Sequence, residues 1–349
     1  MFFDYLTFYG RTYFKDNLLH FNFSASGFGF NFKSKFVQLE FTVEYENENY
    51  PYISLFLDGN RKDYKIDKNN QIINLEIDDL EFHTLKVLKR TEASVSKIAL
   101  KNIVVEKIAQ INENYDYNFL FYGDSITCGY GVLGSSKSRG FKTSEESVID
   151  SYAFKIANNF NAKLSVVAVS GYPIYRGIWN VDEPVRNIYE IIDKADYYPN
   201  TKLDDLPNFN MDSSIPDLIV INLGANDETW FNYDSTWINN NLTIEEMYDQ
   251  LKLEANKLKM QIIEFIKKLR NIYSNAKIIY AIGMLKPHVV IKKAIDEAID
   301  NLIASNEKDI YKFYFNMTNS NDVGANFHPG YGMHQEAAIE LSEFIKKIM

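Results

Sequence analysis

The apolar and polar positions of the chain follow two different patterns, and the change between them falls near residue 112. Up to about residue 110, short apolar runs alternate with polar or turn residues at nearly regular spacing. A series of short strands predicts an antiparallel β-sandwich, jelly-roll-like in outline, over residues 1–112. The expected strands cover 18–23, 28–32, 37–43, 53–57, 72–77, 82–89 and 98–105, with a hairpin signal in Asp-Gly-Asn at 58–60.

From residue 113 to residue 349, strand-like runs alternate with helical periodicity. This alternation predicts an α/β domain of three layers, a parallel sheet with helices on both faces. In such a sheet, ligands bind just beyond the carboxyl ends of the strands. The expected strands are 119–122, 164–169, 218–223, 277–282 and 310–315, and the expected helices are 152–160, 244–273, 289–305 and 335–348.

Composition narrows the possible partners. The net charge is −10 and no basic cluster is present, which argues against nucleic acid and anionic membranes as partners. The single cysteine, Cys128, allows neither an intrachain disulfide nor a cysteine metal cage. No stretch approaches the roughly 20 apolar residues of a membrane span, and the first residues do not read as a secretion signal. We therefore expect a cytoplasmic protein, unless a signal has been removed.

Small and polar residues follow three of the predicted parallel strands. They are Gly-Asp-Ser at 123–125, Ser-Gly at 170–171 and Gly-Ala-Asn-Asp at 224–227. Asn-Phe-His-Pro at 326–329 comes just before the last predicted helix. Together these blocks supply a hydroxyl, a glycine amide, a carboxamide and an imidazole, which are the groups that an acyl-transfer site needs. Taken alone, Gly-Asp-Ser also fits an ordinary turn, so the interpretation depends on the four blocks together.

The four blocks, in this order, resemble those of the SGNH (GDSL-type) hydrolases. Within that superfamily, Gly-Asp-Ser-Ile-Thr-Cys-Gly-Tyr-Gly at 123–131 behind an N-terminal sandwich is similar to carbohydrate esterase family 2, a family of acetyl esterases. The resemblance implies a flavodoxin-like catalytic domain. It also implies removal of O-acetyl groups from an acetylated carbohydrate, a sugar or oligosaccharide, without a metal or another cofactor.

The resemblance also assigns roles to single residues. Ser125 would be the nucleophile, and His328 would be the base that takes the serine proton. The backbone amides of Ser125 and Gly171, with the side-chain amide of Asn226, would form the oxyanion hole. Asp124 and Asp227 are expected to be structural, bonding loop amides near the site. Cys128 is expected to pack beneath the loop after the nucleophile.

One position departs from the family pattern. The superfamily usually carries an aspartate two residues before the histidine, where this chain has Asn326. A carboxamide oxygen can accept the imidazole N–H but contributes no full charge. Three possibilities are open: a Ser-His dyad whose histidine is held by a neutral acceptor, a substitute acid such as Asp322 or Glu336, or a weakened enzyme. We favour the dyad.

Aromatic residues are abundant, at 15% of the chain, and several lie beside the four blocks. Rings next to a catalytic serine can stack on sugar faces, although rings also serve loop packing. Trp230, Trp179 and Tyr172 are the predicted substrate-binding residues, ahead of Tyr130, Tyr175 and Phe231. His334 lacks carboxylates at metal-ligand spacing, so we expect it to cap or flank the final helix.

Two other functions remain open. The same residues would serve a lipase-like or thioesterase-like acyl hydrolase, which would prefer longer acyl chains. A carbohydrate-binding protein with a decayed esterase site would also fit, and the Asn326 departure is its main support.

Overall fold

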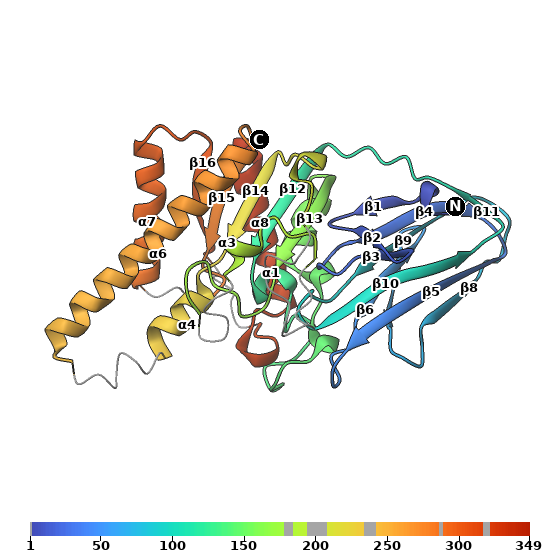
Figure 1. Cartoon of the computed structure of the whole chain (residues 1–349), viewed down its shortest axis with the longest axis horizontal. Helices are drawn as coiled ribbons and strands as arrows, with labels where there is room; N and C mark the ends of the chain where they lie inside the picture. Colours follow the sequence, from blue (N-terminus) through green and yellow to red (C-terminus); the bar gives the residue numbers. More distant parts are fainter. Residues whose placement is uncertain (1, 178–183, 194–207, 234–241, 286–288, 317–321) are drawn as a thin grey trace.

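Two antiparallel sheets and one parallel sheet make up the protein (Figure 1). The computed structural model describes residues 2–177, 184–193, 208–233, 242–285, 289–316 and 322–349. The antiparallel strands end with β11 (Lys107–Ala109) and the parallel strands begin with β12 (Tyr117–Gly123), so the predicted boundary at 112/113 falls between them. No described helix is long and apolar enough to cross a bilayer.

The N-terminal sandwich encloses one hydrophobic core, rich in phenylalanine, between its two sheets. Alternate side chains of its strands point into this core, as the period of two in the sequence predicts. One sheet has the order β1 (Thr7–Tyr9), β4 (Gly27–Lys33), β9 (His83–Lys89), β6 (Tyr52–Leu57), β7 (Asn60–Lys65), with β11 paired to β4. The other has the order β2 (Tyr13–Lys15), β3 (Leu18–His20), β10 (Ser96–Val104), β5 (Phe36–Tyr45), β8 (Ile72–Glu76).

All seven runs predicted as strands contain one, but four strands were not predicted. β1, β2 and β11 have only three residues each, too few for a pattern. β7 reads Asn-Arg-Lys-Asp-Tyr-Lys and no residue of it is buried, because it lies at the edge of its sheet. Edge strands carry charged residues that protect them from further pairing, and this hides them from a search for apolar runs.

The second domain confirms the predicted parallel sheet. Its order is β13 (Ala162–Ala168), β12, β14 (Leu218–Asn222), β15 (Lys277–Ile282), β16 (Ile310–Tyr314), and every neighbouring pair is parallel. The helices α2 (Tyr152–Asn159) and α8 (Tyr331–Ile348) share a core with Phe119 and Phe121 of β12. The helices α6 (Ile244–Ile272) and α7 (Val289–Ala304) share the other core with Leu120 and Tyr122. Successive residues of β12 therefore face opposite helical layers.

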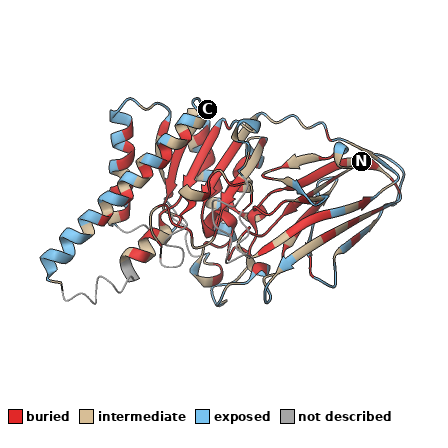
Figure 2. Ribbon diagram, in the orientation of Figure 1, coloured by how far each residue is buried: buried red, intermediate tan, exposed pale blue. Residues whose placement is uncertain are grey.

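The exposure of the chain follows this layering. Figure 2 shows the parallel strands buried along most of their length, whereas long stretches of α6 and α7 are exposed. Buried residues recur on α6 at Leu258, Ile262, Phe265 and Leu269, the spacing of one helical face. The remaining elements are short: α1 (Ser125–Cys128), α3 (Val185–Ile188), α4 (Ala225–Tyr233) and the 3-10 helices Phe2–Tyr5, Thr143–Glu145, Val148–Asp150, Met211–Ser213 and Ala325–Phe327.

Candidate active site

Ser125 is the first residue of α1, immediately beyond the carboxyl end of β12. Asp124 caps this short helix, because its side chain accepts a hydrogen bond from the Ile126 amide at 3.0 Å. The Ser125 amide stands at the start of the helix, where backbone N–H groups have no intrahelical acceptor. The side chain is almost buried, with 7% of the residue exposed. The turn therefore presents a hydroxyl and a backbone N–H together.

His328 lies within hydrogen-bond distance of this hydroxyl. Its Nε2 atom is 2.9 Å from Ser125 Oγ, and its Nδ1 atom is 3.2 Å from the backbone carbonyl oxygen of Asn326. A proton on Nδ1 satisfies the carbonyl and leaves the Nε2 lone pair facing the serine. Burial lowers the pKa of His328 below its usual value, although the backbone bonds of Asn326 and Ala325 oppose this. A neutral imidazole, the form that acts as a base, is thereby favoured at neutral pH.

Asn326 orients His328 with its backbone and not with its side chain. The carboxamide points to other partners: Nδ2 donates to the Tyr130 hydroxyl at 3.0 Å, and Oδ1 accepts from the Gly140 amide at 3.2 Å. The residue has a φ of +51°, a left-handed conformation that asparagine adopts more readily than most residues. The expected neutral acceptor is therefore present, but it is the carbonyl oxygen and not the carboxamide oxygen.

The two acids considered as substitutes do not orient the imidazole. Both ring nitrogens of His328 are engaged by Ser125 and the Asn326 carbonyl. The carboxylate of Asp322 instead accepts a hydrogen bond from the Gly332 amide in the first turn of α8. Among the three possibilities that the sequence left open, this geometry fits the dyad.

The loop after Ser125 supports the histidine. The Tyr130 ring meets the imidazole edge-on, with centroids 4.5 Å apart and planes at 74°, and it stacks on Phe141 at 4.8 Å. Gly131 has a φ of +81°, and a Cβ there would lie 2.7 Å from the Ala325 carbonyl oxygen and 2.9 Å from His328 Cβ. Sequence reasoning missed both supports, although the Gly-Tyr-Gly at 129–131 was a visible signal.

Asn226, the predicted side-chain donor to an oxyanion, lies in the first turn of α4 beyond β14. Its Nδ2 atom donates to Asp124 Oδ2 and to the Tyr172 carbonyl oxygen, each at 3.2 Å. The amide is thus held beside the residue that precedes Ser125. It has to release one of these two long bonds to donate to an oxyanion.

Two buried aspartates fix the loops of the site, as predicted. The carboxylate of Asp227 accepts from three successive amides, those of Ile174, Tyr175 and Arg176, at 2.8–3.0 Å. These amides follow Gly171, which has a φ of +81°. Burial raises the pKa of Asp227 to about 6, and it raises that of Asp124 to about 7.

A buried carboxylate of the N-terminal domain also reaches the site. Glu92, in the loop after β9, is 1% exposed, and its Oε2 atom accepts from the Ser170 amide at 2.8 Å.

Glu92 also belongs to a cluster with Glu146 and Cys128. One carboxylate oxygen of each glutamate and the cysteine sulfur lie within 4.8 Å of one another, a spacing that could hold a cation. However, Glu146 accepts from the Glu92 amide at 3.0 Å. Burial also raises the pKa values of Glu146 and Cys128, which favours their protonated forms. The geometry therefore describes a hydrogen-bonded cluster, and Cys128 is buried as expected.

The aromatic residues predicted to bind substrate are largely buried where the structure describes them. Tyr172 is 1% exposed and packs in the core shared with α6, so the prediction that its ring contacts substrate is wrong. Its contribution to the site is the carbonyl oxygen that holds Asn226. Trp230 is 4% exposed, with the Arg176 guanidinium 5.0 Å from its ring centroid, so little of this ring is open to a ligand. Trp179 lies outside the described residues.

His334 caps a helix, but not the one expected. It lies in the first turn of α8, and its Nδ1 atom accepts from the amide of Tyr152, the first residue of α2, at 3.1 Å. Burial lowers its pKa to about 3, so the ring stays neutral and can accept this bond. The two histidines of this segment therefore have separate tasks.

A serine after the first parallel strand and a histidine from the last loop place the chain in a defined class. The chain belongs to the GDSL-like lipase/acylhydrolase family, whose model matches residues 121–308. Residues 8–113 match the N-terminal domain model of carbohydrate esterase 2.

Individual relatives agree with this assignment. The chain is 26% identical over 270 residues to the cellulase/esterase CelE of Acetivibrio thermocellus; the match covers 76% of this chain but only 30% of CelE. The fold matches a family two carbohydrate esterase from Clostridium thermocellum in complex with cellohexaose, with a TM-score of 0.79, 21% identity and 98% coverage of both chains. It also matches an acetyl xylan esterase from Butyrivibrio proteoclasticus, with a TM-score of 0.80, 23% identity and coverage of 99% of this chain and 95% of that one.

Proposed function

We propose that this protein is a serine esterase that removes O-acetyl groups from a sugar or oligosaccharide. The observation that carries the proposal is the distance of 2.9 Å between His328 Nε2 and Ser125 Oγ. A hydroxyl at this distance from a neutral imidazole can lose its proton as it attacks a carbonyl carbon. Membership of the acylhydrolase family supports the same chemistry.

The reaction proceeds in two halves. Ser125 Oγ attacks the acetyl carbonyl while His328 Nε2 takes its proton, and the carbonyl of Asn326 holds the ring in place through Nδ1. The amides of Ser125 and Gly171 and the Asn226 side chain stabilise the oxyanion. His328 then gives the proton to the departing sugar oxygen. Water, deprotonated by the same imidazole, then attacks the acetyl-serine carbonyl. The bond from the acetyl carbon to Ser125 Oγ breaks, His328 returns the proton to Oγ, and acetate leaves.

The choice of a sugar acetate rests on the N-terminal domain as well as on the site. That domain matches carbohydrate esterase 2, and the similar proteins named above are carbohydrate esterases. Since the chain spans 30% of the length of CelE, the activity of that larger protein is not carried over as a whole. Location in the cytoplasm stays a prediction.

The test is acetate release from a panel of acetylated xylo- and cello-oligosaccharides, with the Ser125→Ala variant alongside. We expect release by the wild type and none by Ser125→Ala. A wild-type protein that releases no acetate from any member of the panel would contradict the proposal.

A series of nitrophenyl esters separates this function from a lipase-like one. Acetyl preference supports the sugar esterase, whereas octanoyl preference supports a lipase-like or thioesterase-like hydrolase. A protein that binds the oligosaccharides, hydrolyses no ester and is not labelled by a fluorophosphonate would be a binding protein with a decayed site.

A further inference from the structure

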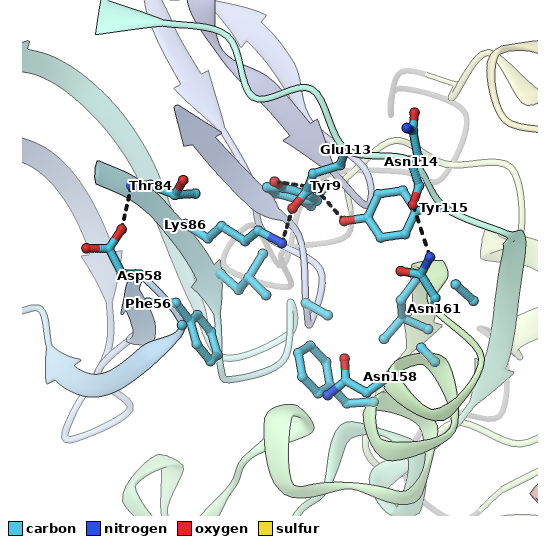
Figure 3. Close-up of a pocket in the computed structure, with 17 residues that line it drawn as sticks. Tyr9, Phe56, Asp58, Thr84, Lys86, Glu113, Asn114, Tyr115, Asn158 and Asn161 are labelled. Atoms are coloured by element: carbon cyan, nitrogen blue, oxygen red, sulfur yellow. Dashed lines mark hydrogen bonds and ion pairs between the residues drawn. The ribbon is translucent and has the colours of Figure 1, made fainter. Parts of the chain in front are cut away.

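A cavity of about 630 Å³ lies between the sandwich and the catalytic domain (Figure 3). Lys86 of β9 lines it on one side, and Asn158 of α2 and Ala162 of β13 line it on the other. Ala162 and Leu164 line the cavity from the start of β13, whose carboxyl end leads to Gly171, so the cavity is roughly 13 to 20 Å from the active-site edge at about 3.3 Å per residue. It is therefore separate from the catalytic site, and its volume is in the usual range for small-ligand pockets.

The walls of the cavity combine aromatic rings with hydrogen-bonding groups. The half-buried rings are those of Phe56, Tyr115 and Phe154, contributed by both domains, whereas the ring of Tyr9 is buried behind the wall. Flat rings offer a surface to the apolar faces of a sugar, and neighbouring polar groups can bond its hydroxyls. Asn114 and Asn158 are exposed at the margin, which opens the cavity to solvent.

The charged side chains that line the cavity already have partners of opposite charge. The Glu113 carboxylate pairs with the Lys86 ammonium and accepts from the hydroxyls of Tyr9 at 2.8 Å and Tyr115 at 2.6 Å (Figure 3). Asp58 pairs with His83 at 2.7 Å and accepts from the Thr84 amide at 2.8 Å. A lining of this kind does not attract an ion, and it favours a neutral ligand with many hydroxyls.

Asn158 offers hydrogen-bonding capacity that the described part of the chain does not use. No hydrogen bond joins its side-chain amide to another described residue, and Figure 3 shows it across the space from Lys86 and Tyr115. The Lys86 ammonium has three N–H groups, of which the pair with Glu113 needs one or two. We propose that this cavity is a second, non-catalytic site for a short neutral oligosaccharide. The choice of a sugar as ligand rests on the proposed function.

Calorimetric titration with xylotriose and cellotriose tests this site in a Ser125→Ala background. We expect Asn158→Ala and Lys86→Met each to weaken binding about fivefold, the effect of one lost hydrogen bond. Asn159→Ala, the next residue on α2, is the matched control, since Asn159 does not line the cavity and bonds to Ser342. In the active protein, the three substitutions should leave hydrolysis of nitrophenyl acetate unchanged.

The proposal is overturned if neither sugar binds at millimolar concentration. It is equally overturned if Asn158→Ala and Lys86→Met bind the sugars as tightly as Asn159→Ala does. Failure of the proposed function would appear separately, as a lack of nitrophenyl acetate hydrolysis by the wild type.

A different observation concerns the loop that follows β9. Glu92 Oε2 accepts from the Ser170 amide at 2.8 Å, while Oε1 accepts from the Ser94 hydroxyl. The backbone of Glu92 is held as well, since its amide donates to Glu146 and its carbonyl oxygen accepts from Lys89 Nζ at 2.9 Å. The peptide that Glu92 fixes is next to Gly171. We infer that Glu92 is a positioning residue, which sets the direction of the Gly171 amide.

Three variants test this role, which also rests on the proposed function. Glu92→Ala should lower kcat for nitrophenyl acetate roughly 10- to 100-fold with little change in KM, because a displaced donor weakens only the transition state. Glu92→Gln keeps an oxygen acceptor and should recover most of the loss. Asp193→Ala is the control, because Asp193 is also buried and bonds across the domains to Tyr13 and Asn22, away from Ser170.

An unchanged kcat in Glu92→Ala would contradict the role of Glu92. So would a loss of kcat that Asp193→Ala shares or that Glu92→Gln fails to rescue. If Glu92→Ala fails to fold, the comparison of Glu92→Gln with the wild type decides, since its kcat should fall less than about threefold.

Discussion

The sandwich touches the catalytic domain along β9 and again in the loop beyond it, and the two contacts are built differently. Beyond the C-terminal end of β9, polar groups are buried and bonded across the domains. Arg90 donates to the carbonyl oxygens of Thr143 and Ser144, and Glu92 accepts from Ser170. Along the strand itself, Thr84, Lys86 and Leu88 border a cavity of about 630 Å³. The strand thus borders an open site, and the loop that follows it contributes to a closely packed one.

This difference shows what each contact can do. Buried polar groups are costly unless every bond is made, so the contact near Ser125 holds loops in one conformation. Such rigidity suits a reaction that needs donors in place before charge develops. At the cavity, Glu113 also bonds Lys86 and Tyr9, but these bonds leave an open space whose remaining hydrogen-bonding groups can receive a ligand. Changes in the buried contact around Glu92 should therefore lower kcat, and changes at the cavity should leave kcat unchanged.

The largest expected effect is that of Ser125→Ala. Without the hydroxyl no acyl-enzyme forms, and we expect kcat for nitrophenyl acetate to fall at least about 10⁴-fold. The unfolding temperature should change little. Asn158→Ala, in the cavity, should keep full activity. A fall in its kcat comparable to that of Ser125→Ala would contradict the difference between the cavity and the buried contact.

Asn226→Ala should follow, with a loss of roughly 10²- to 10³-fold in kcat. This is the usual cost of removing one oxyanion donor, and it should leave KM nearly unchanged. Steady-state kinetics with nitrophenyl acetate measure both constants. A loss below about threefold would show that the amide serves only to bond Asp124 and Tyr172.

Two glycines, one beside the active site and one at the cavity, give a matched pair of substitutions. Gly131 and Gly59 both have positive φ, +81° and +83°, but a Cβ at Gly131 would press on Ala325 and His328, whereas one at Gly59 would meet nothing within 4 Å. Gly131→Ala should displace His328 and lower kcat about 10²-fold. Gly59→Ala, at the cavity, should cost about 1 kcal/mol of stability through its backbone and leave kcat unchanged. Equal kinetic effects would contradict the comparison.

The pH dependence gives a subtler test of the base. Because burial lowers the pKa of His328 and the base must be deprotonated, kcat/KM should rise through a pKa below 6.5 and then remain level at neutral pH. Asp124, with a pKa of about 7, is the other group of the site that titrates in this range. An acidic limb at or above 6.5 that is kept in an Asp124→Asn variant would show that His328 carries a stabilising carboxylate partner after all.

The smallest effect is expected for Asn326→Asp. The side chain does not face the imidazole and the carbonyl remains, so activity should stay equal or rise slightly. Asn326→Ala loses two hydrogen bonds and a residue suited to φ of +51°, and should lower activity more. A large loss in Asn326→Asp alone would mean that the carboxamide has a specific role in the reaction.

Most of the fold was readable from the sequence because its strands and helices carry strong periodic patterns. The parallel strands are almost wholly apolar, and the glycine, serine, asparagine and histidine at their ends follow in a recognisable order. Edge strand β7 escaped because its polar residues face solvent. The prediction that Tyr172 binds substrate was wrong because the ring is buried, and the sequence next to a motif does not show whether an aromatic side chain faces a cleft or the core.

Local sequence patterns could not predict the residues that position the site from other parts of the chain. Glu92 is separated from Ser170 by 78 residues and sits in no motif, so only the tertiary structure brings them together. The same holds for the cavity, whose lining comes from segments of both domains. The carbonyl that orients His328 belongs to the predicted residue, but a sequence says which side chain is present and not which backbone atom acts.

The most direct measurement is labelling with a fluorophosphonate, followed by intact-mass and peptide analysis, with acetate release from acetylated xylotriose measured in parallel. The Ser125–His328 pair predicts one adduct per chain, on the peptide that contains Ser125, with activity falling in proportion to labelling. Ser125→Ala and His328→Ala should not be labelled. Acetate release that persists after complete labelling, or a wild-type protein that neither reacts nor releases acetate, would contradict the account.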